Sequence, residues 1–436
     1  MALTGRTALI AALGALLVGL LLPSWTGLLA VELPLLLAIL YDLLLAAPVR
    51  KLQFTRSGDT SVRLGERAHV DLVLGNPSRR PLRALVRDAW PPSSWPDGDG
   101  IAASRHRLTL APGERHRLTT PLHPVRRGDR RAARVTVRSH GPLGLAARQG
   151  SHEVPWTLRV LPAFTSRKHL PAKTARLREL DGRTSILTRG EGTEFDSLRE
   201  YVPGDDTRSI DWRATARQTT VAVRTWRPER DRRVLIVLDT GRTSAGRVGD
   251  APRLDAAMDA ALLLTALASR AGDQVDLLAY DRRARATVRG RTARDVLPAF
   301  VEAMAPIEPA LVESDTRGMA ATALHFARRR SLVVLLTGLE AAAVEEQLLP
   351  VLPQLTRRHT VLVAAIADPR IEEMAASRGT VDAVYEAASA ARTQAERRHT
   401  AERLRSHGAL VVDATPDTLA PVLADSYLAL KSAGRL

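Results

Sequence analysis

The residues best placed to do chemistry follow a buried strand pattern in the C-terminal half of the chain. The apolar run 233–239 ends in an acid, and hydroxyl residues follow it in the loop Asp239-Thr240-Gly241-Arg242-Thr243-Ser244. A carboxylate with hydroxyls at alternating positions supplies the oxygen ligands that divalent cations prefer. The loop lacks the patterns of a phosphate-binding loop, a dinucleotide fingerprint and a serine-hydrolase elbow. It therefore indicates an ion site rather than a catalytic nucleophile.

A second segment, residues 192–230, is dense in charge, turns and aromatic side chains. Paired carboxylates there could do acid–base work or bind a divalent ion, and arginines mixed with aromatics could bind nucleic acid. Acids and bases nearly balance and the segment has no histidine, so we favour a folded clamp that joins two domains, with a partner-contact surface as the alternative. A clamp predicts that Trp212 and Arg208 are buried. The candidate clamp or partner residues are Arg199, Tyr201, Asp205, Asp206, Arg208, Asp211, Trp212 and Arg217.

Composition narrows the function classes. The 436-residue chain has no cysteine, which excludes disulfide frameworks, thiolate metal sites and cysteine nucleophiles. Lys and Arg number 63 against 47 Asp and Glu, a net charge of +16 that favours anionic partners such as nucleic acid, acidic proteins or lipid headgroups. Hydrophobic residues make up 45% and charged residues 25%, which are ordinary globular values.

Two apolar runs, Thr7–Leu22 and Leu28–Ala47, occupy the N-terminal region. A spanning helix needs roughly 17–25 apolar residues, so residues 1–50 are predicted to form a transmembrane helical hairpin. A signal peptide and a buried soluble hairpin are the alternatives. The acid in the second run, Asp42, is expected near the headgroups without a special role.

Basic residues flank this hairpin and are absent from its turn: Arg6 precedes the first run, and Arg50, Lys51 and Arg56 follow the second. The positive-inside rule then places both ends in the cytoplasm. The expected localisation is the cell membrane, multi-pass, with the C-terminal domains in the cytoplasm.

The elements that must position these residues follow from periodicity. Residues 51–162 show short alternating runs with Gly, Pro and Asn punctuation, which predict a small antiparallel β-sandwich domain. Residues 163–231 are the charged linker or clamp. Residues 232–436 alternate apolar strands with helical patterns, which predict a doubly wound α/β sheet. Ligands of such sheets bind at the carboxyl ends of the strands, where Asp239 lies.

The order of these parts resembles the bacterial family called domain of unknown function fifty-eight. The resemblance covers nearly the whole chain and rests on Leu198-Arg199-Glu200-Tyr201, Pro203-Gly204-Asp205-Asp206, Arg208-Ser209-Ile210-Asp211-Trp212, Ala216-Arg217 and Pro228-Glu229-Arg230-Asp231. It implies a C-terminal domain similar to von Willebrand factor A domains. It also implies association with AAA+ ATPases of the MoxR type and chaperone-like or assembly roles, without an established enzymatic activity.

The resemblance also frames the ion site. Von Willebrand factor A domains usually carry Asp-x-Ser-x-Ser after the first strand, a Thr from a later loop and an Asp after the fourth strand. Here Asp239 matches, Gly241 and Thr243 hold the next two positions, and Gly338 stands where the later Asp is expected. The middle ligand is expected near residues 314–316 (Ser314, Asp315 or Thr316). The missing oxygens predict weak or no magnesium binding at Asp239 and Thr243.

These observations lead to one functional expectation and two alternatives. We expect a non-enzymatic, membrane-anchored scaffold or adaptor that binds a partner protein, a MoxR-type AAA+ ATPase being implied by the resemblance. A metal-dependent hydrolase using Asp239, Asp205 and Asp206 is one alternative, and a basic nucleic-acid-binding protein, suggested only by the net charge, is the other. No cofactor and no small-molecule substrate are expected.

Overall fold

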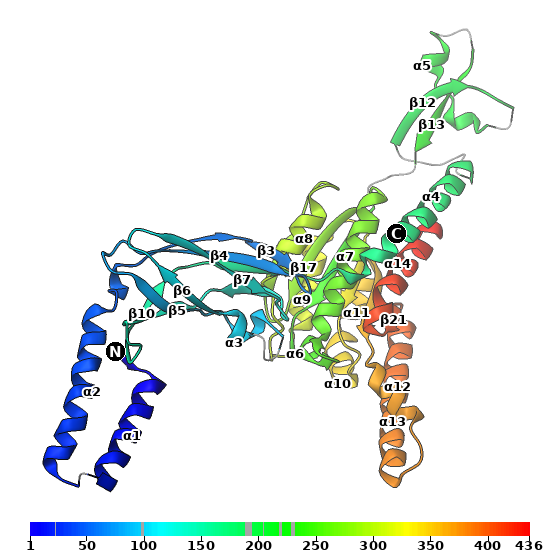
Figure 1. Cartoon of the computed structure of the whole chain (residues 1–436). Helices are drawn as coiled ribbons and strands as arrows, with labels where there is room; N and C mark the ends of the chain where they lie inside the picture. Colours follow the sequence, from blue (N-terminus) through cyan, green and yellow to red (C-terminus); the bar gives the residue numbers. More distant parts are fainter. Residues whose placement is uncertain (22, 97–99, 188–193, 204, 218–219, 228–231) are drawn as a thin grey trace. The chain divides into compact units, whose positions relative to one another are not determined.

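The computed structural model describes residues 1–21, 23–96, 100–187, 194–203, 205–217, 220–227 and 232–436. The chain divides into two compact units, Met1–Leu161 and Pro162–Leu436. The division falls at the predicted end of the β domain. It groups the apolar helices with the β domain, and the charged segment with the α/β domain (Figure 1).

Unit 1 begins with two apolar helices, α1 (Gly5–Leu21) and α2 (Trp25–Leu45). By length and composition, one described helix is able to cross a membrane, the stretch Trp25–Lys51 that contains α2. At 1.5 Å per residue the 17 residues of α1 span about 26 Å, short of the roughly 30 Å hydrocarbon core. The expectation of two full spans is therefore supported only for the second apolar run.

The rest of unit 1 is a mainly antiparallel β domain. Its strands form three sheets, in the orders β1-β10-β9-β5-β6, β2-β4-β7 and β3-β11-β8. The strands are β1 (Ala2–Leu3), β2 (Gln53–Gly58), β3 (Ser61–Arg63), β4 (Ala68–Gly75), β5 (Leu82–Asp88), β6 (Arg105–Leu110), β7 (Arg115–Leu122), β8 (Gly128–Arg131), β9 (Arg134–His140), β10 (Ala146–Glu153) and β11 (Thr157–Leu161). Short helical turns are η1 (Val49–Lys51), η2 (Pro92–Ser94) and α3 (Gly100–Ala103).

Alternation along these strands explains their packing. In β4 and β5 every second residue is buried, because successive side chains of a strand point to opposite faces. Leu72 and Leu74 of β4 share one apolar core with Val86 of β5 and Val137 of β9. Side chains from two different sheets therefore meet in one core, which agrees with the predicted sandwich-like β domain.

Asp42, near the C-terminal end of α2, is fully buried against the β domain. Its carboxylate accepts hydrogen bonds from the backbone N–H groups of Leu143 (2.8 Å), Leu145 (2.6 Å) and Ala146 (2.8 Å). Thr7 of α1 donates to the carbonyl of Leu145 in the same loop. The expectation that Asp42 has no special role is wrong, because this acid fixes the loop before β10 onto α2.

Unit 2 contains a six-stranded sheet in the order β18-β17-β14-β19-β20-β21. Strands β14 (Arg233–Asp239), β17 (Gln274–Tyr280), β19 (Leu332–Leu336), β20 (Thr360–Ile366) and β21 (Leu410–Ala414) pair in parallel, and β18 (Ala284–Val288) is antiparallel. The helices of this region are α6 (Arg242–Ala245), α7 (Arg253–Arg270), α8 (Val296–Met304), α9 (Thr316–Phe326), α10 (Ala341–Ala343), the π-helix η5 (Val344–Leu348), α11 (Leu352–Thr356), α12 (Pro369–Ala376), α13 (Val381–Ser406) and α14 (Pro416–Ser432). A two-stranded ribbon pairs β15 (Arg247–Val248) with β16 (Ala251–Pro252).

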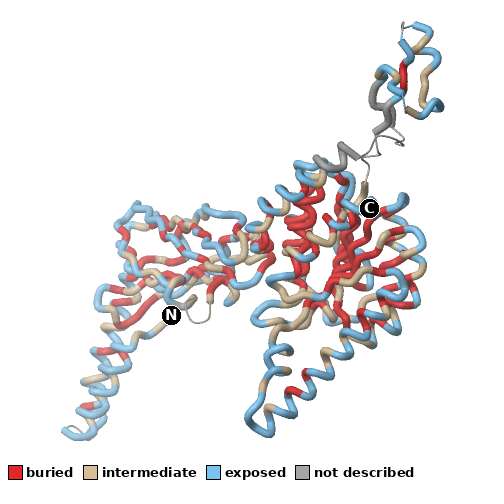
Figure 2. Tube along the Cα trace, turned by 90° about the vertical axis from the view of Figure 1, so that its right-hand side faces the viewer, coloured by how far each residue is buried: buried red, intermediate tan, exposed pale blue. Residues whose placement is uncertain are grey.

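The central strands of this sheet are buried on both faces, which explains their continuous apolar sequences. On one face Leu235, Val333 and Val363 pack in a core with side chains of α9 and α11. Helices α7 and α14 contact each other and the sheet. Figure 2 shows the buried residues of this unit concentrated along the sheet. The expected parallel α/β sheet is therefore present.

Residues 163–231 contain a helical part and a separate β-hairpin. The turn η3 (Thr165–His169) leads into α4 (Leu170–Leu187), which packs on α7 and α14. Lys173 of α4 pairs with Asp425 of α14 at 2.7 Å. The hairpin joins β12 (Glu194–Glu200) to β13 (Ala222–Arg227), with η4 (Thr207–Ser209) and α5 (Trp212–Thr215) between them.

Candidate functional site at Asp239

Asp239 is the last residue of the central strand β14, and only 4% of its surface is exposed. Its Oδ1 accepts the Gly241 N–H at 2.9 Å and the Ser314 hydroxyl at 2.5 Å. Its Oδ2 accepts the hydroxyls of Thr243 at 2.9 Å and Thr337 at 2.6 Å. An ionised carboxylate offers about four lone-pair sites, so these four donors saturate it.

Three separate chain segments bring these donors together. Thr243 comes from α6, Ser314 from the loop before α9, and Thr337 directly follows β19. Parallel strands end at the same edge of a sheet, so the residues after β14 and β19 meet there. The loops are held in place by backbone bonds, the Arg242 N–H to the Val312 carbonyl at 2.8 Å among them.

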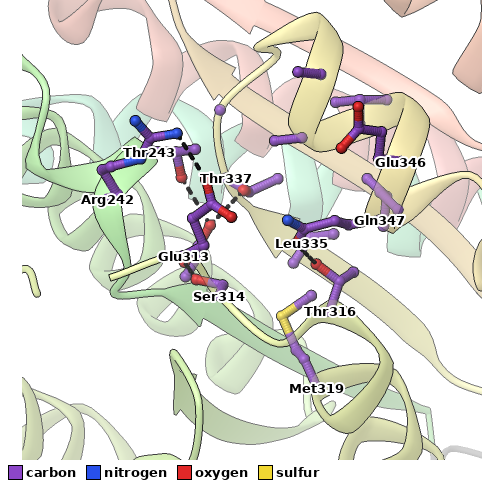
Figure 3. A pocket seen from close by; sticks show the side chains of 16 residues that line it. Arg242, Thr243, Glu313, Ser314, Thr316, Met319, Leu335, Thr337, Glu346 and Gln347 are labelled. Carbon is purple, nitrogen blue, oxygen red and sulfur yellow. Dashed lines mark hydrogen bonds and ion pairs between the residues drawn. The ribbon is translucent and has the colours of Figure 1, made fainter. Parts of the chain in front are cut away.

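A pocket opens beside Asp239 with a cavity volume of about 90 Å³. Figure 3 shows Thr243, Ser314 and Thr337 on one side of it, with Glu346 and Gln347 of η5 opposite. Gln347 accepts a hydrogen bond from the Thr316 hydroxyl at 3.2 Å. The apolar residues that line the pocket are Met319, Leu335, Ala342, Ala343, Val344 and Leu348.

The wall formed by η5 is unusual, because a π-helix replaces the regular helical turn there. The Leu349 N–H bonds the Val344 carbonyl at 2.8 Å, a spacing of five residues. Single π-turns occur frequently at functional sites. Val344 and Leu348 are buried, whereas Glu346 is exposed, so this turn presents a carboxylate at the pocket rim.

The rim also carries an exposed ion pair, Arg242 to Glu313 at 2.9 Å. Both side chains are more than 60% exposed, so the pair contributes little to stability. The pocket lining includes neither histidine nor lysine. The hydroxyls of Thr243, Ser314 and Thr337 all donate to the Asp239 carboxylate.

The magnesium expected of a von Willebrand factor A site does not fit these residues well. A Cβ on Gly338 would overlap the Glu340 carboxylate, so Glu340 occupies the space expected for the second acid. Glu340 is paired with Arg253, which neutralises its charge. Among the described residues, Asp239 is therefore the only acid that hydrogen-bonds the hydroxyls of Thr243, Ser314 and Thr337. Mg²⁺ prefers several hard oxygen ligands in near-ideal octahedral geometry. The geometry favours the prediction of weak or no magnesium binding.

The missing hydroxyl at Gly241 has a structural explanation. A Cβ at this position would overlap Ser314 Oγ and lie 2.9 Å from the Val312 carbonyl oxygen. Ser314 thus supplies from another loop the hydroxyl absent from residue 241. Of the three residues expected to hold the middle position, Ser314 contacts Asp239, Asp315 caps α9 through the Gly318 N–H at 3.0 Å, and Thr316 binds Gln347.

Sequence reasoning missed two members of this region. Thr337 was not predicted to contact Asp239, although it follows a buried strand at the same sheet edge. Asp281, which follows β17 and is 3% exposed, accepts backbone N–H groups from Arg282 and Arg283 and a side-chain bond from Arg285. The sequence signal that could have found both residues is that each directly follows a buried apolar strand, β17 or β19, of the sheet that also contains β14.

The clamp residues form local contacts within the β12–β13 hairpin. Arg199 pairs with Asp205 at 2.6 Å, and this bond raises the Arg199 pKa. Asp206 caps η4 through the Arg208 N–H at 2.9 Å. The Tyr201 N–H donates to the Val221 carbonyl at 2.8 Å.

Asp211 caps α5 and pairs with Arg224 at 2.8 Å. The hydrogen bond from the Ala214 N–H, followed by that from Arg224, lowers the Asp211 pKa. Trp212 is 69% exposed, and Arg208 and Arg217 are exposed as well. The expectation that Trp212 and Arg208 are buried in a clamp is therefore wrong, since the hairpin is held by its turns and backbone ladder.

Comparison with known proteins identifies the C-terminal region. Residues 197–410 match the family model described as Protein of unknown function DUF58. An uncharacterized protein of Mycobacterium tuberculosis is 30% identical over 190 residues, which cover 43% of this chain and 59% of that protein. The uncharacterized protein YeaD of Bacillus subtilis is 28% identical over 211 residues, 46% of this chain and 51% of that protein. The matches thus span little more than half the length of these relatives.

Among solved structures, a crystal structure of native alpha-2-macroglobulin from Escherichia coli aligns with 27% of this chain and 17% of its own. Its sequence identity of 19% and TM-score of 0.22 are too low to support an argument. The family match therefore carries the assignment, and it includes β14, the Asp239 loop, Ser314 and Thr337. Residues 197–410 of this chain are a domain of the DUF58 family.

Proposed function

We propose that this chain is a non-enzymatic, membrane-anchored adaptor, and that it binds a partner protein at the pocket beside Asp239. The observation that carries the proposal is that a buried carboxylate with all its hydrogen-bond sites filled lies beside a pocket wall that offers both apolar and charged side chains. Asp239 is satisfied by four donors, so it positions the loops rather than reacting. Val344, Leu348 and Glu346 of η5 offer apolar surface and a free rim carboxylate.

This wall suits a long side chain with an apolar stem and a cationic head. The apolar lining accepts the stem, while Glu346 at the rim pairs with a lysine or arginine of the partner. The family resemblance suggests a MoxR-type AAA+ ATPase as this partner. Assembly or maturation of cell-envelope or other complexes is the role that such a pair would serve.

The membrane anchor in this proposal is α2, with α1 completing the hairpin. Exposed leucines along both helices, such as Leu13, Leu36 and Leu40, support a lipid environment. The basic residues after α2 support a cytoplasmic location for the remainder of the chain, which is part of this proposal. A reporter fused after Leu436 should be active only in the cytoplasm, and periplasmic activity would disprove this topology.

The partner is tested by affinity capture of the tagged full chain from native membranes, followed by identification of copurifying ATPases. Glu346→Lys should reduce the captured ATPase at least about tenfold, because it places a like charge opposite the partner's cation. Glu402→Lys, a charge reversal at an exposed position of α13 outside the pocket, is the matched control. Equal capture by both variants, or no ATPase with the wild-type chain, would count against the proposal.

A further inference from the structure

Two exposed patches on unit 2 carry aromatic residues framed by opposite charges. The first, called the Trp212 patch, lies on the β12–β13 hairpin. Trp212 is 69% exposed and Val202 56% exposed. Val221, also exposed, lies beside them, because the Tyr201 N–H bonds its carbonyl and the Asp211 N–H bonds the next carbonyl along.

The Trp212 patch is basic over residues 208–217, which hold three arginines and one acid, whereas the hairpin as a whole is balanced by acids such as Glu200 and Asp206. Asp205 pairs with Arg199, and Asp211 with Arg224. The three arginines of residues 208–217 are exposed, and none of them pairs with an acid among the described residues. They are Arg208, Arg213 and Arg217.

The second patch, called the arm tip, lies where α12 meets α13. The two helices run side by side as an arm (Figure 1). The C-terminal half of α13 is anchored in the core by Ala401 and Leu404, whereas Val381 (72% exposed), Val384 (53%) and Tyr385 (74%) are uncovered near its start. The spacing of these three residues places them on one helical face.

Acids frame the arm tip. Glu372, Glu373, Asp382 and Glu386 are all exposed, and Arg378 is turned onto the carbonyls of Ala375 and Ser377. A chain of net charge +16 therefore carries a local acidic surface around exposed apolar side chains.

We propose that the Trp212 patch of one copy docks on the arm tip of a second copy. Interfaces are stabilised chiefly by buried aromatic and arginine side chains, which Trp212 and Tyr385 with the three arginines provide. Opposite charges around an apolar centre fix the orientation of docking and suppress like-to-like contact. The contact is heterologous, so a pair of copies leaves one patch unused on each copy. Further copies bind these patches and form a closed ring or an open chain.

The test follows the full chain in detergent by sedimentation velocity over a range of concentrations. The wild-type chain should associate as concentration rises. Trp212→Ala should weaken association about tenfold or more while leaving the melting temperature unchanged, because this side chain is exposed. A chain that is monomeric at every concentration, or a Trp212→Ala variant that associates like the wild type, would overturn the proposal.

Charge reversal gives the sharper test. A basic-patch variant, R208E/R213E/R217E, and an arm-tip variant, E372R/E373R/D382R/E386R, should each lose self-association. A chain that combines all seven substitutions should regain it, because both charges are then reversed. The control R291E/R294E/R317E changes the net charge equally at exposed sites elsewhere and should associate like the wild type.

Other occupants would give different results. If the combined variant stays monomeric although it folds, the two patches do not pair with each other. If the wild-type chain binds vesicles of anionic lipid through Trp212 but does not self-associate, the Trp212 patch is a lipid surface. If crosslinks join the two patches within one chain at all concentrations, the contact is intramolecular. Each of these results would reject docking between copies.

Discussion

Ser314 occupies the space that a side chain on Gly241 would need, and its hydroxyl binds the Asp239 carboxylate that follows β14. The backbone of Gly241 has φ −84°, which any residue can adopt. Glycine is therefore required here for space and not for conformation. The hydroxyl ring around Asp239 is completed by a different loop from the one that a reading of the local motif suggests.

The first prediction concerns the space beside Gly241 that Ser314 fills. Gly241→Ser should destabilise the fold by roughly 1–3 kcal/mol, because its Cβ meets Ser314 Oγ and the rigid Val312 carbonyl. Gly246→Ser is the control, since a Cβ there would be 3.5 Å from Arg253, an ordinary contact. Urea unfolding measures the difference. Adding Ser314→Gly should recover part of the loss, and equal midpoints for Gly241→Ser and the control would refute the steric explanation.

The second prediction concerns magnesium. Millimolar Mg²⁺ should leave the melting temperature of the full chain unchanged, because Asp239 is saturated by protein donors and Glu340 is held by Arg253. A ligand at 100 times its dissociation constant would add about 2.7 kcal/mol to the free energy of unfolding, an easily measured rise. A rise in melting temperature that Asp239→Ala abolishes would show that the site holds the ion.

The third prediction concerns Asp42. Asp42→Ala should lower the free energy of unfolding by about 3 kcal/mol or more, because it leaves two buried and one partly buried backbone N–H groups without their acceptor. Glu32→Ala, at an exposed position of the same helix, should change little. Hydrogen exchange at the amides of residues 143, 145 and 146 should speed up only in the Asp42 variant. Unchanged protection there would contradict the role of this acid as a cap.

The fourth prediction concerns pH. His359 is 5% exposed, and neither ring nitrogen has a hydrogen-bond partner in the part of the chain that the structure describes. Burial, and to a smaller extent the charge of Arg358, lowers its pKa below the ordinary 6.5. The unfolded chain then takes up the proton first as pH falls, so this group costs stability progressively below about pH 6.5. The difference in melting temperature between about pH 8 and about pH 5.5 should be smaller in His359→Phe than in the wild type. His106 and His140 also have lowered pKa values, so both wild type and variant should still lose some stability as the pH falls. An identical pH profile for wild type and variant would exclude a contribution from His359.

The sheet of unit 2 was predictable because its strands are buried on both faces and read as continuous apolar runs, as in Leu332–Leu336. Asp239 was predictable because an acid directly follows such a run. Thr337 was not, because only the parallel register of β14 and β19 brings its hydroxyl to the Asp239 carboxylate.

Other elements left weak signals in the sequence. Helix α13 is exposed over most of its N-terminal half, so it lacks the apolar periodicity that predicts a packed helix, and the segment 369–407 carried no prediction. Trp212 was expected to be buried because the segment was interpreted as a clamp between domains, whereas it is exposed on a hairpin held by local turn bonds and a two-stranded ladder. Residue type does not show what a small hairpin can cover.

The carboxylate of Asp42 has a mechanical consequence. It joins the last turn of α2 to the loop before β10, and the Arg148 side chain holds the Leu43 carbonyl at 2.9 Å beside it. A swivel between helix and β domain would have to break these bonds together. Tilt or displacement of α2 would therefore move the β domain with it, so α2 and the β domain of unit 1 move as one rigid body rather than as two parts joined by a flexible linker.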